Sequence, residues 1–443
     1  MEENIKPKKR GMASWLKVFL IILVTIIVGG AAYGGIFYWH NLRGIWTSIL
    51  PAKENIATTI ENSENVVLQE NKQEVFVAND TQMPLQLPDG FSISIYAKEL
   101  GSPRVIVDDP NKNLIVSLTS NGKVVALLDN DANGKSDETK VLAENLNSPH
   151  GLAFDCKDLN NCKLYVAESN QVSIYDYDVN KVEIKNKKKI IDLPDQGMHF
   201  TRTLLIDPNI NRLLISVGSD CNVCNEKDNK RASILSANLD GTDLKTYASG
   251  LRNSVFMTMH PKTGQIFAND MGRDLLGDNL PPDEVNIIKE DKKYGWPFCY
   301  GRNVRDNTFN DDVPVGVCAE PNYVPSYIDM QAHSAPLGLQ FVPDTANWPE
   351  DFRNDLIIAY HGSWNRTVPT GYKLVKYDMD ANGNYVVDEK SLPKMTDFIT
   401  GWLTPKNESL GRPTGILIHD DGVMYIADDK AGVIYRVFYG KAS

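Results

Sequence analysis

Histidine and arginine recur at the same place in a repeated strand pattern, just before an apolar strand. Acidic side chains and a further histidine recur just after the next strand of several repeats. Guanidinium groups bind carboxylates through charge-assisted hydrogen bonds, and an imidazole accepts protons near neutral pH. If the fold brings these positions together, the sequence predicts a pocket for an anionic ligand that also contains a general base.

The residues of this pattern form two groups. Those before first strands are Arg104, His150, Arg202, Arg252, Asn253, His333 and Arg412. Those after second strands are Asp220, Asp270, Arg273, His361 and Asp428. Any one of them could instead cap a strand end and satisfy loop carbonyl groups, but the whole set favours a ligand pocket.

The strands that must position these side chains occur in six similar copies. Each copy has an apolar strand, a turn rich in Asp, Pro and Gly, and two further strands. The first strands are predicted at 105–110, 151–156, 203–208, 255–261, 337–343 and 414–421. Such units cannot bury their faces alone, so we expect an all-β, six-bladed β-propeller whose ring is closed by the strand at 91–97. The first strand of each blade lines the channel, which places both groups of side chains at one mouth.

The N-terminal region indicates a membrane anchor. Residues 18–39 form an uncharged, apolar run of 22 residues, which spans about 33 Å as a helix. Basic residues concentrate before the run, so the positive-inside rule leaves the N-terminus in the cytoplasm and the domain outside. We expect a cytoplasmic segment at 1–14, a transmembrane anchor at 15–39, a polar linker or stalk at 40–87 and the propeller at 88–443. A cleaved signal peptide is the alternative.

Charge and cysteine content limit the partners. The formal net charge of −11 disfavours binding to nucleic acid. The six cysteines are close in pairs along the sequence, which predicts three short-range disulfides in an oxidising compartment. These cysteines are Cys156, Cys162, Cys221, Cys224, Cys299 and Cys318. A zinc site is disfavoured because the CxxC at Cys221 and Cys224 has no second CxxC, and Asn225 stands where a c-type haem motif needs histidine.

Several common enzyme signatures are missing from the sequence. No GxGxxG follows a strand, and the segment ANGKS fails as a phosphate-binding loop because Asp129 stands in place of its first glycine. Neither GxSxG nor HExxH occurs. Two loops at 129–138 and 378–383 alternate acidic residues before a glycine, for which ordinary turns are favoured over calcium sites.

Several segments, among them HFTRTLLIDP, GLRNSVFMTMHP, YGWPFCYG, AYHGSWNRT and GRPTGILIHDDG, together resemble the glucose/sorbosone dehydrogenase family. Members of that family are six-bladed propellers that use pyrroloquinoline quinone (PQQ). The resemblance runs from about residue 87 to 439 and is closest to the sorbosone and pyranose dehydrogenase branch.

The resemblance implies a role for each matched position. His199 would be the general base, with Arg202 beside the reacting oxygen. The cofactor would contact Arg252, Asn253, His361, Trp364 and Arg412. Calcium would bind backbone carbonyls around Met271, Gly272 and Arg273, and the substrate side would include His150 and His333. Because His199 and Arg202 are three residues apart, an extended strand would point them to opposite sides. We therefore expect an irregular backbone at Phe200 and Thr201 that lets both side chains reach the pocket.

The predicted function is a membrane-anchored, PQQ- and calcium-dependent dehydrogenase that oxidises a sugar or sugar-derived aldehyde. Since the chain has no haem motif, its electrons must pass to a separate acceptor, a quinone or a cytochrome. The sequence departs from the glucose branch at His150, His361 and Ser254, which leaves the substrate open. Two alternatives remain. One is a metal-dependent lactonase or hydrolase using Asp220, Asp270 and Asp428, and the other is a non-catalytic propeller that binds carbohydrate or protein.

Overall fold

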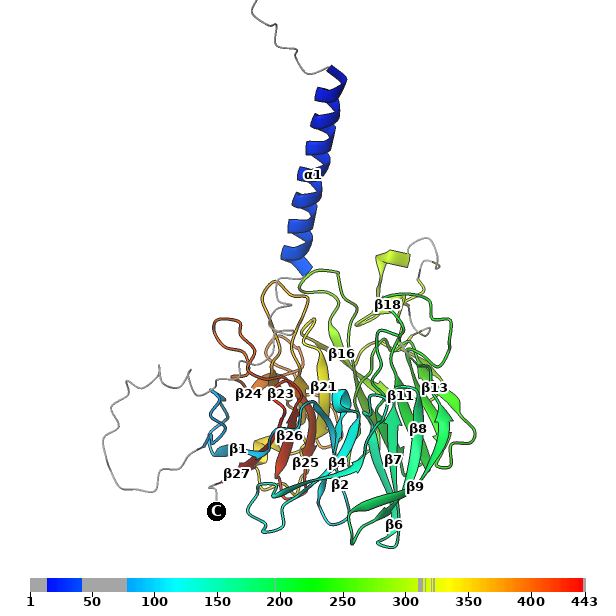
Figure 1. Ribbon diagram of the computed structural model, residues 1–443, viewed down its shortest axis with the longest axis vertical. Coiled ribbons are helices and arrows are strands. Elements are labelled where there is room, and N and C mark those ends of the chain that lie inside the picture. Colours follow the sequence, from blue (N-terminus) through cyan, green and yellow to red (C-terminus); the bar gives the residue numbers. More distant parts are fainter. Residues whose placement is uncertain are drawn as a thin grey trace, which may run out of the picture.

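The computed structural model describes residues 14–41, 78–195, 197–309, 314, 316–319, 321 and 323–440 (Figure 1). The predicted cytoplasmic segment up to residue 13 and the stalk residues 42–77 lie outside this description. Helix α1 (Ser14–Asn41) covers the predicted anchor. Among the described residues, no helix combines the length and apolar character needed to cross a membrane.

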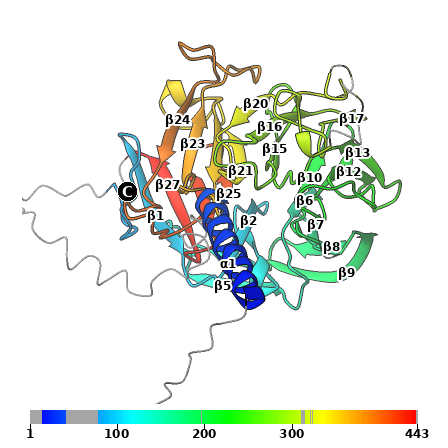
Figure 2. The ribbon, with the colours of Figure 1, turned by 90° about the horizontal axis from the view of Figure 1, so that it is seen from above.

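The described domain consists of six antiparallel sheets arranged around a central axis, which confirms the predicted six-bladed propeller (Figure 2). The first three blades are β2 (Pro103–Asp108) to β5 (Glu138–Ala143), β6 (Leu152–Asp158) to β9 (Glu183–Asp192), and β10 (Leu204–Asp207) to β13 (Lys245–Ser249). Their middle strands are β3 (Leu114–Leu118), β4 (Lys123–Leu128), β7 (Asn161–Glu168), β8 (Gln171–Asp178), β11 (Arg212–Val217) and β12 (Ser233–Asn238).

The fourth and fifth blades carry the remaining chain up to residue 399. The fourth is β14 (Met257–Met259), β15 (Ile266–Asp270), β16 (Asp283–Ile288) and β20 (Ile328–Met330). The fifth is β21 (Pro336–Phe341), β22 (Leu356–Tyr360), β23 (Lys373–Tyr377) and β24 (Met395–Ile399). Between β16 and β20, β17 (Lys292–Lys293) joins the third blade, and β18 (Cys299–Tyr300) with β19 (Val304–Arg305) forms a small hairpin.

The sixth blade joins the two ends of the domain. It contains β25 (Pro413–Ile418), β26 (Met424–Asp428) and β27 (Val433–Tyr439), with β1 (Phe91–Ala97) as its outer strand. The predicted closure is therefore confirmed, with Phe91 opposite Tyr439. The inner strands also contact one another in a ring, β2 to β6, β6 to β10, β10 to β14, β14 to β21, β21 to β25 and β25 back to β2.

The inner strands approach closely at the axis. A Cβ on Gly415 of β25 would lie 2.2 Å from the carbonyl oxygen of Arg104 on β2, so only a glycine fits there. The core fills the spaces between blades, where apolar residues of neighbouring sheets pack together, as Phe267 of the fourth blade does with Phe341 of the fifth. This packing fixes the strand ends, and hence the side chains at the mouth of the channel.

The segment just before the predicted start of the domain is part of the folded structure. Residues 78–87, expected as the end of the stalk, instead pack on the domain, because Met83 and Leu85 are buried and Gln86 pairs with Thr400. The domain thus begins earlier than residue 88.

The three short-range disulfides are confirmed as Cys156–Cys162, Cys221–Cys224 and Cys299–Cys318.

Candidate functional site

A cavity of about 450 Å³ opens at the mouth of the channel, where segments before inner strands meet segments after second strands. The predicted residues that line it are His199, Arg252, Asn253, Gly272, His333, His361, Trp364 and Arg412. The remaining arginine of its wall is Arg104, which the strand pattern included. The fold thus brings together residues from blades that are far apart in the sequence.

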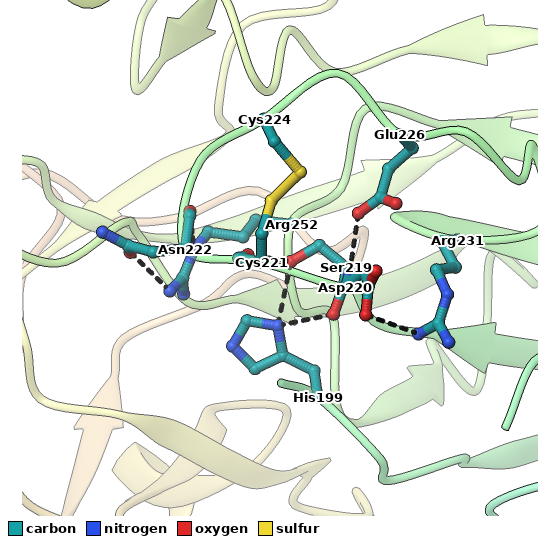
Figure 3. Close-up of a disulfide and its surroundings, with 9 residues drawn as sticks. All are labelled: His199, Ser219, Asp220, Cys221, Asn222, Cys224, Glu226, Arg231 and Arg252. Atoms are coloured by element: carbon teal, nitrogen blue, oxygen red, sulfur yellow. Dashed lines mark hydrogen bonds and ion pairs between the residues drawn. A yellow bond between two sulfur atoms is a disulfide. The ribbon is translucent and has the colours of Figure 1, made fainter. Parts of the chain in front are cut away.

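His199 lies in the irregular segment before β10, which begins only at Leu204, as the spacing of His199 and Arg202 predicted. Its Nδ1 lies 3.0 Å from the carbonyl oxygen of Ser219 and 2.9 Å from the Ser219 hydroxyl (Figure 3). A carbonyl oxygen only accepts, so Nδ1 carries the proton and Nε2 keeps the lone pair. Burial, followed by the charges of Arg252 and Arg202, lowers the pKa of His199 to about 3. The imidazole is therefore neutral and can accept a proton at Nε2.

A glycine makes room for this histidine. A Cβ on Gly218, which follows β11, would lie 2.6 Å from Cβ of His199 and 2.7 Å from Oδ1 of Asn253. Real side chains do not pack that closely, so the bare backbone at residue 218 leaves the space that His199 and Asn253 occupy.

Arg252 is buried and held on several sides. Its Nε donates to the carbonyl oxygen of Asn222 at 2.8 Å, and Nη2 donates to Oδ1 of Asn222 at 2.9 Å. Nη1 donates to the carbonyl oxygens of Met271 and Gly272 at 3.2 and 2.9 Å. Asp274 forms an ion pair with Nη2 at 3.2 Å. The guanidinium is thereby fixed at the cavity wall.

A second charged cluster lines the opposite part of the ring, on the fifth, sixth and first blades. Asp429 accepts from Nη1 of Arg104 at 2.7 Å and contacts Nε2 of His361 at 2.9 Å. Arg412 donates to the carbonyl oxygens of His361 and Gly362 at 3.0 and 2.5 Å. Although burial alone would raise it, the pKa of Asp429 is lowered by His361, Arg104 and Arg412. Asp429 was not predicted, although it adjoins Asp428 in the strand pattern.

Aromatic and amide side chains complete the wall. Trp364 is 37% exposed and Phe200 is 44% exposed, and both line the cavity. Asn365 donates to Asp274 at 2.9 Å, while its own Oδ1 is buried and has no partner among the described residues. His333 also lines the cavity, with Nε2 2.8 Å from the carbonyl oxygen of Gly277 and 3.0 Å from that of Leu280.

Two predicted ligand contacts are corrected. Arg202 and His150 are both 0% exposed and neither lines the cavity. Arg202 donates to the carbonyl oxygens of Pro194, His199 and Thr201, groups that the irregular segment leaves without strand partners. His150 lies beneath it, 3.3 Å from the carbonyl oxygen of Arg202. The irregular backbone brings His199 to the cavity but turns Arg202 away from it.

The predicted metal loop has a mixed outcome. Met271 and Gly272 both line the cavity, and backbone carbonyl oxygens such as theirs suit calcium. Arg252 competes for both oxygens. Arg273 directs its guanidinium elsewhere, pairing with Asp306 at 2.9 Å.

The acids proposed for a metal-dependent hydrolase do not converge. Asp270 accepts the backbone amides of Arg252 and Asn253, and Asp428 accepts that of Arg412. Asp220 has a mostly exposed side chain. Among the described residues, two groups of three potential metal ligands lie close together, Asp129 with Asp131 and Asp137, and Cys221 with Cys224 and Glu226, whose two sulfur atoms are already joined in a disulfide. Neither group lines the cavity, so the geometry does not favour the hydrolase.

Comparison with known proteins extends this picture. Residues 85–439 match the model of the TrAA12-like family. An uncharacterized protein of Borreliella burgdorferi is 32% identical over 82% of this chain and 93% of its own length. A pyrroloquinoline quinone-dependent pyranose dehydrogenase of Coprinopsis cinerea is 25% identical over 80% of this chain, which spans only 54% of that enzyme.

Solved structures agree on the fold. The holo PQQ domain of the Coprinopsis cinerea pyranose dehydrogenase superposes with a TM-score of 0.68 at 22% identity, covering 81% of this chain and 98% of that domain. The calcium structure of a Trichoderma reesei protein of Carbohydrate-Active Enzymes Family AA12 gives 0.69 at 23% identity, covering 84% and 100%. The family match spans the whole propeller, from the segment that packs before β1 to the last residue of β27, and on this ground the chain belongs to the TrAA12-like family.

Proposed function

We propose that this protein is a PQQ-dependent oxidoreductase that oxidises a sugar or sugar-derived aldehyde. The observation that carries the proposal is one cavity lined by three arginines, Arg104, Arg252 and Arg412, and by a neutral histidine, His199. An acidic chain has little other reason to gather buried guanidinium groups at one mouth. The relative from Coprinopsis cinerea is named as a PQQ-dependent pyranose dehydrogenase, which supports the same assignment.

The cavity residues fit this cofactor. PQQ carries three carboxylates on a flat ring system, and arginine forks are suited to bind carboxylates. Arg104 has a buried Nε without a hydrogen-bond partner among the described residues, so it has a donor to offer. Trp364 presents a partly exposed indole ring that can contact a flat ligand. We assign Arg104 and Arg412 to carboxylates, and Arg252 with Asn253 to the quinone oxygens.

The chemistry divides between cofactor and protein. When bound, PQQ supplies an acceptor for two electrons. His199 takes the proton of the substrate hydroxyl at Nε2, because Nδ1 is already protonated and donates to Ser219. Arg202 acts indirectly, since its hydrogen bond to the carbonyl oxygen of His199 holds the segment that carries the base. Phe200, Trp364 and His333 form the rim on which a sugar ring would rest.

Calcium belongs to the proposal as a second cofactor. The carbonyl oxygens of Met271 and Gly272 are hard donors, and the carboxylate of Asp274 is on the same wall. A calcium ion there requires Arg252 to turn toward the bound anion. Removal of calcium by chelation should then reduce PQQ affinity, and readdition should restore it.

The three disulfides indicate an extracytoplasmic domain. We propose in addition that residues 15–39 anchor it to a membrane; this part rests on the uncharged apolar run at 18–39 in the sequence, since helix α1 was not found to meet the requirements for a membrane span. Electrons would then pass to a quinone or cytochrome outside the cytoplasm. Retention of the protein in membranes after alkaline carbonate washing would support the anchor, and release into the wash would contradict it.

The decisive experiment reconstitutes the purified full-length protein with PQQ and calcium. Reduction of an artificial dye is then followed with aldoses, sorbosone and simple lactones as separate substrates. We expect dye reduction with a sugar only when PQQ is present, and its loss in His199→Ala. Lactone hydrolysis without PQQ would favour the hydrolase, whereas saturable sugar binding without turnover would favour a binding protein.

A further inference from the structure

A single short loop contacts both His199 and Arg252, two residues with different roles in the proposed function. This loop, residues 219–226, follows β11 and contains the Cys221–Cys224 disulfide (Figure 3). On one side it contacts His199, the assigned base, and on the other it contacts Arg252, which is assigned to the quinone oxygens. Neither contact follows from the strand pattern.

The contact to the base runs through Ser219. Its buried hydroxyl donates to the carbonyl oxygen of Cys221 at 2.7 Å. With its proton so committed, the hydroxyl oxygen can only accept from Nδ1 of His199, at 2.9 Å. The carbonyl oxygen of Cys221 therefore fixes the direction of the Ser219 O–H bond. That orientation in turn favours the form of His199 in which Nδ1 holds the proton. The half-cystine thus acts on the base through one intervening side chain.

The contact to Arg252 runs through Asn222, the first of the two residues within the CxxC turn. Its carbonyl oxygen and Oδ1 accept from Nε and Nη2 of Arg252 at 2.8 and 2.9 Å. Oδ1 also accepts the backbone amide of Asp274 at 2.8 Å. Asn222 thus holds the guanidinium group of Arg252 beside Asp274, whose carboxylate neutralises its charge.

The loop is closed around these two contacts. The amide of Ser219 donates to the carbonyl oxygen of Arg252 at 2.8 Å, and the amide of Asp220 donates to Glu226 at 2.7 Å. The disulfide ties the residue before Asn222 to the second residue after it, so the turn that presents Asn222 cannot open while the bond is intact.

We propose that Ser219 and Asn222 are positioning residues for His199 and Arg252, and that the Cys221–Cys224 disulfide holds both in one element. The proposal rests on the function assigned above. Loss of the disulfide should degrade proton transfer and cofactor binding together, whereas loss of the Ser219 or Asn222 side chain should degrade only one of them.

The test uses the full-length, PQQ-loaded protein and separates turnover from cofactor affinity. Ser219→Ala should lower kcat about 3- to 10-fold with unchanged PQQ affinity, because one acceptor of the imidazole proton is lost. Asn222→Ala should weaken PQQ binding about 3- to 10-fold in a fluorescence titration, because Nη2 of Arg252 loses its acceptor Oδ1, while the backbone carbonyl oxygen of residue 222 remains. Cys221→Ser with Cys224→Ser should show both defects. The matched control is Cys156→Ser with Cys162→Ser, a disulfide outside the cavity wall, which should show neither.

A second readout does not depend on catalysis. The amides of Met198 and His199 donate to carbonyl oxygens of this loop, and the loop's own Ser219 amide donates to the carbonyl oxygen of Arg252, so their hydrogen exchange reports the integrity of the loop. Exchange there should be faster in the Cys221 and Cys224 double variant than in the control. Unchanged exchange, or equal kinetic defects in both double variants, would overturn the inference. Faster exchange in a protein that never binds PQQ would sustain the positioning role and reject the proposed function instead.

Discussion

The carboxylate of Asp429 bridges His361 and Arg104, with Oδ1 2.9 Å from Nε2 of the histidine and Oδ2 2.7 Å from Nη1 of the arginine. Residue 429 follows the last blade's second strand, and its two partners come from the fifth and first blades. The side chain supplies the negative charge nearest to Arg104 in the cavity wall. In the proposed function, Asp429 competes with a ligand carboxylate for that arginine.

Asp429→Asn should therefore have opposite effects on the empty and loaded protein. Removing one member of a buried ion pair leaves Arg104 unbalanced, at a cost of about 3 kcal/mol in the free energy of unfolding. A bound anion restores the balance, so PQQ should raise the melting temperature more in the variant than in the wild type. Thermal unfolding with and without PQQ measures both. An equal PQQ-induced shift in the two proteins would show that Asp429 and the ligand do not share Arg104.

His199→Ala should lower kcat by about 10²- to 10⁴-fold while PQQ stays bound, because a general base contributes that much. Steady-state kinetics and a PQQ titration on the same preparation separate the two effects. Phe200→Ala, at the neighbouring rim position, serves as the comparison and should act mainly on KM. Turnover of His199→Ala near the wild-type rate would remove His199 from the role of base.

The pH dependence follows from the lowered pKa of His199. Burial and the charges of Arg252 and Arg202 bring it to about 3 from an ordinary value of 6.5. An imidazole accepts a proton only when neutral, so kcat should show no acid limb near pH 6.5 and should hold down to about pH 4. A kcat profile measured with a saturating sugar tests this. A decline of kcat centred near pH 6.5 would contradict the lowered pKa and would mean that the charge of bound PQQ cancels the effect of Arg252 and Arg202 on His199.

Arg412→Lys should weaken PQQ binding about 10-fold or more, since lysine keeps the charge but loses the guanidinium fork. Arg412 also donates to the carbonyl oxygens of His361 and Gly362, so Lys is a milder test than Ala. Isothermal titration with PQQ gives the affinity. The matched control is Arg436→Lys on β27, outside the cavity wall, where no change is expected.

Glu284→Gln should flatten the pH dependence of stability. Burial, followed by the charge of Asp270, raises the pKa of Glu284 from 4.5 to about 8. Between these two values the folded protein holds a proton that the unfolded chain releases. The free energy of unfolding that this group contributes is therefore fully present below pH 4.5 and is lost as the pH rises toward 8, by at most about 1.4 kcal/mol per pH unit. Urea unfolding at pH 5 and 8 measures the loss. The same slope in wild type and Glu284→Gln would contradict the assignment, and exposed Glu389→Gln is the control.

The sequence by itself determined the repeat, and through the repeat much of the site. Apolar strands and turn residues recur at a regular spacing, and six such units can bury their faces only in a closed ring. The register then places the residues before first strands at one mouth, which is why Arg104, Arg252 and Arg412 were found together, whereas His199 came from the family resemblance. The disulfides were also local, because each joins cysteines that lie close in the sequence.

Tertiary structure alone decided which of these side chains reach the cavity. Arg104 and Arg202 occupy the same position in their repeats, yet only Arg104 lines the wall. The backbone before β10 is irregular and leaves carbonyl oxygens unpaired, and a buried guanidinium satisfies them more favourably than solvent can. Arg104 instead meets Asp429, a partner 325 residues away. No local spacing encodes such a contact, because it exists only once the first and sixth blades are packed side by side.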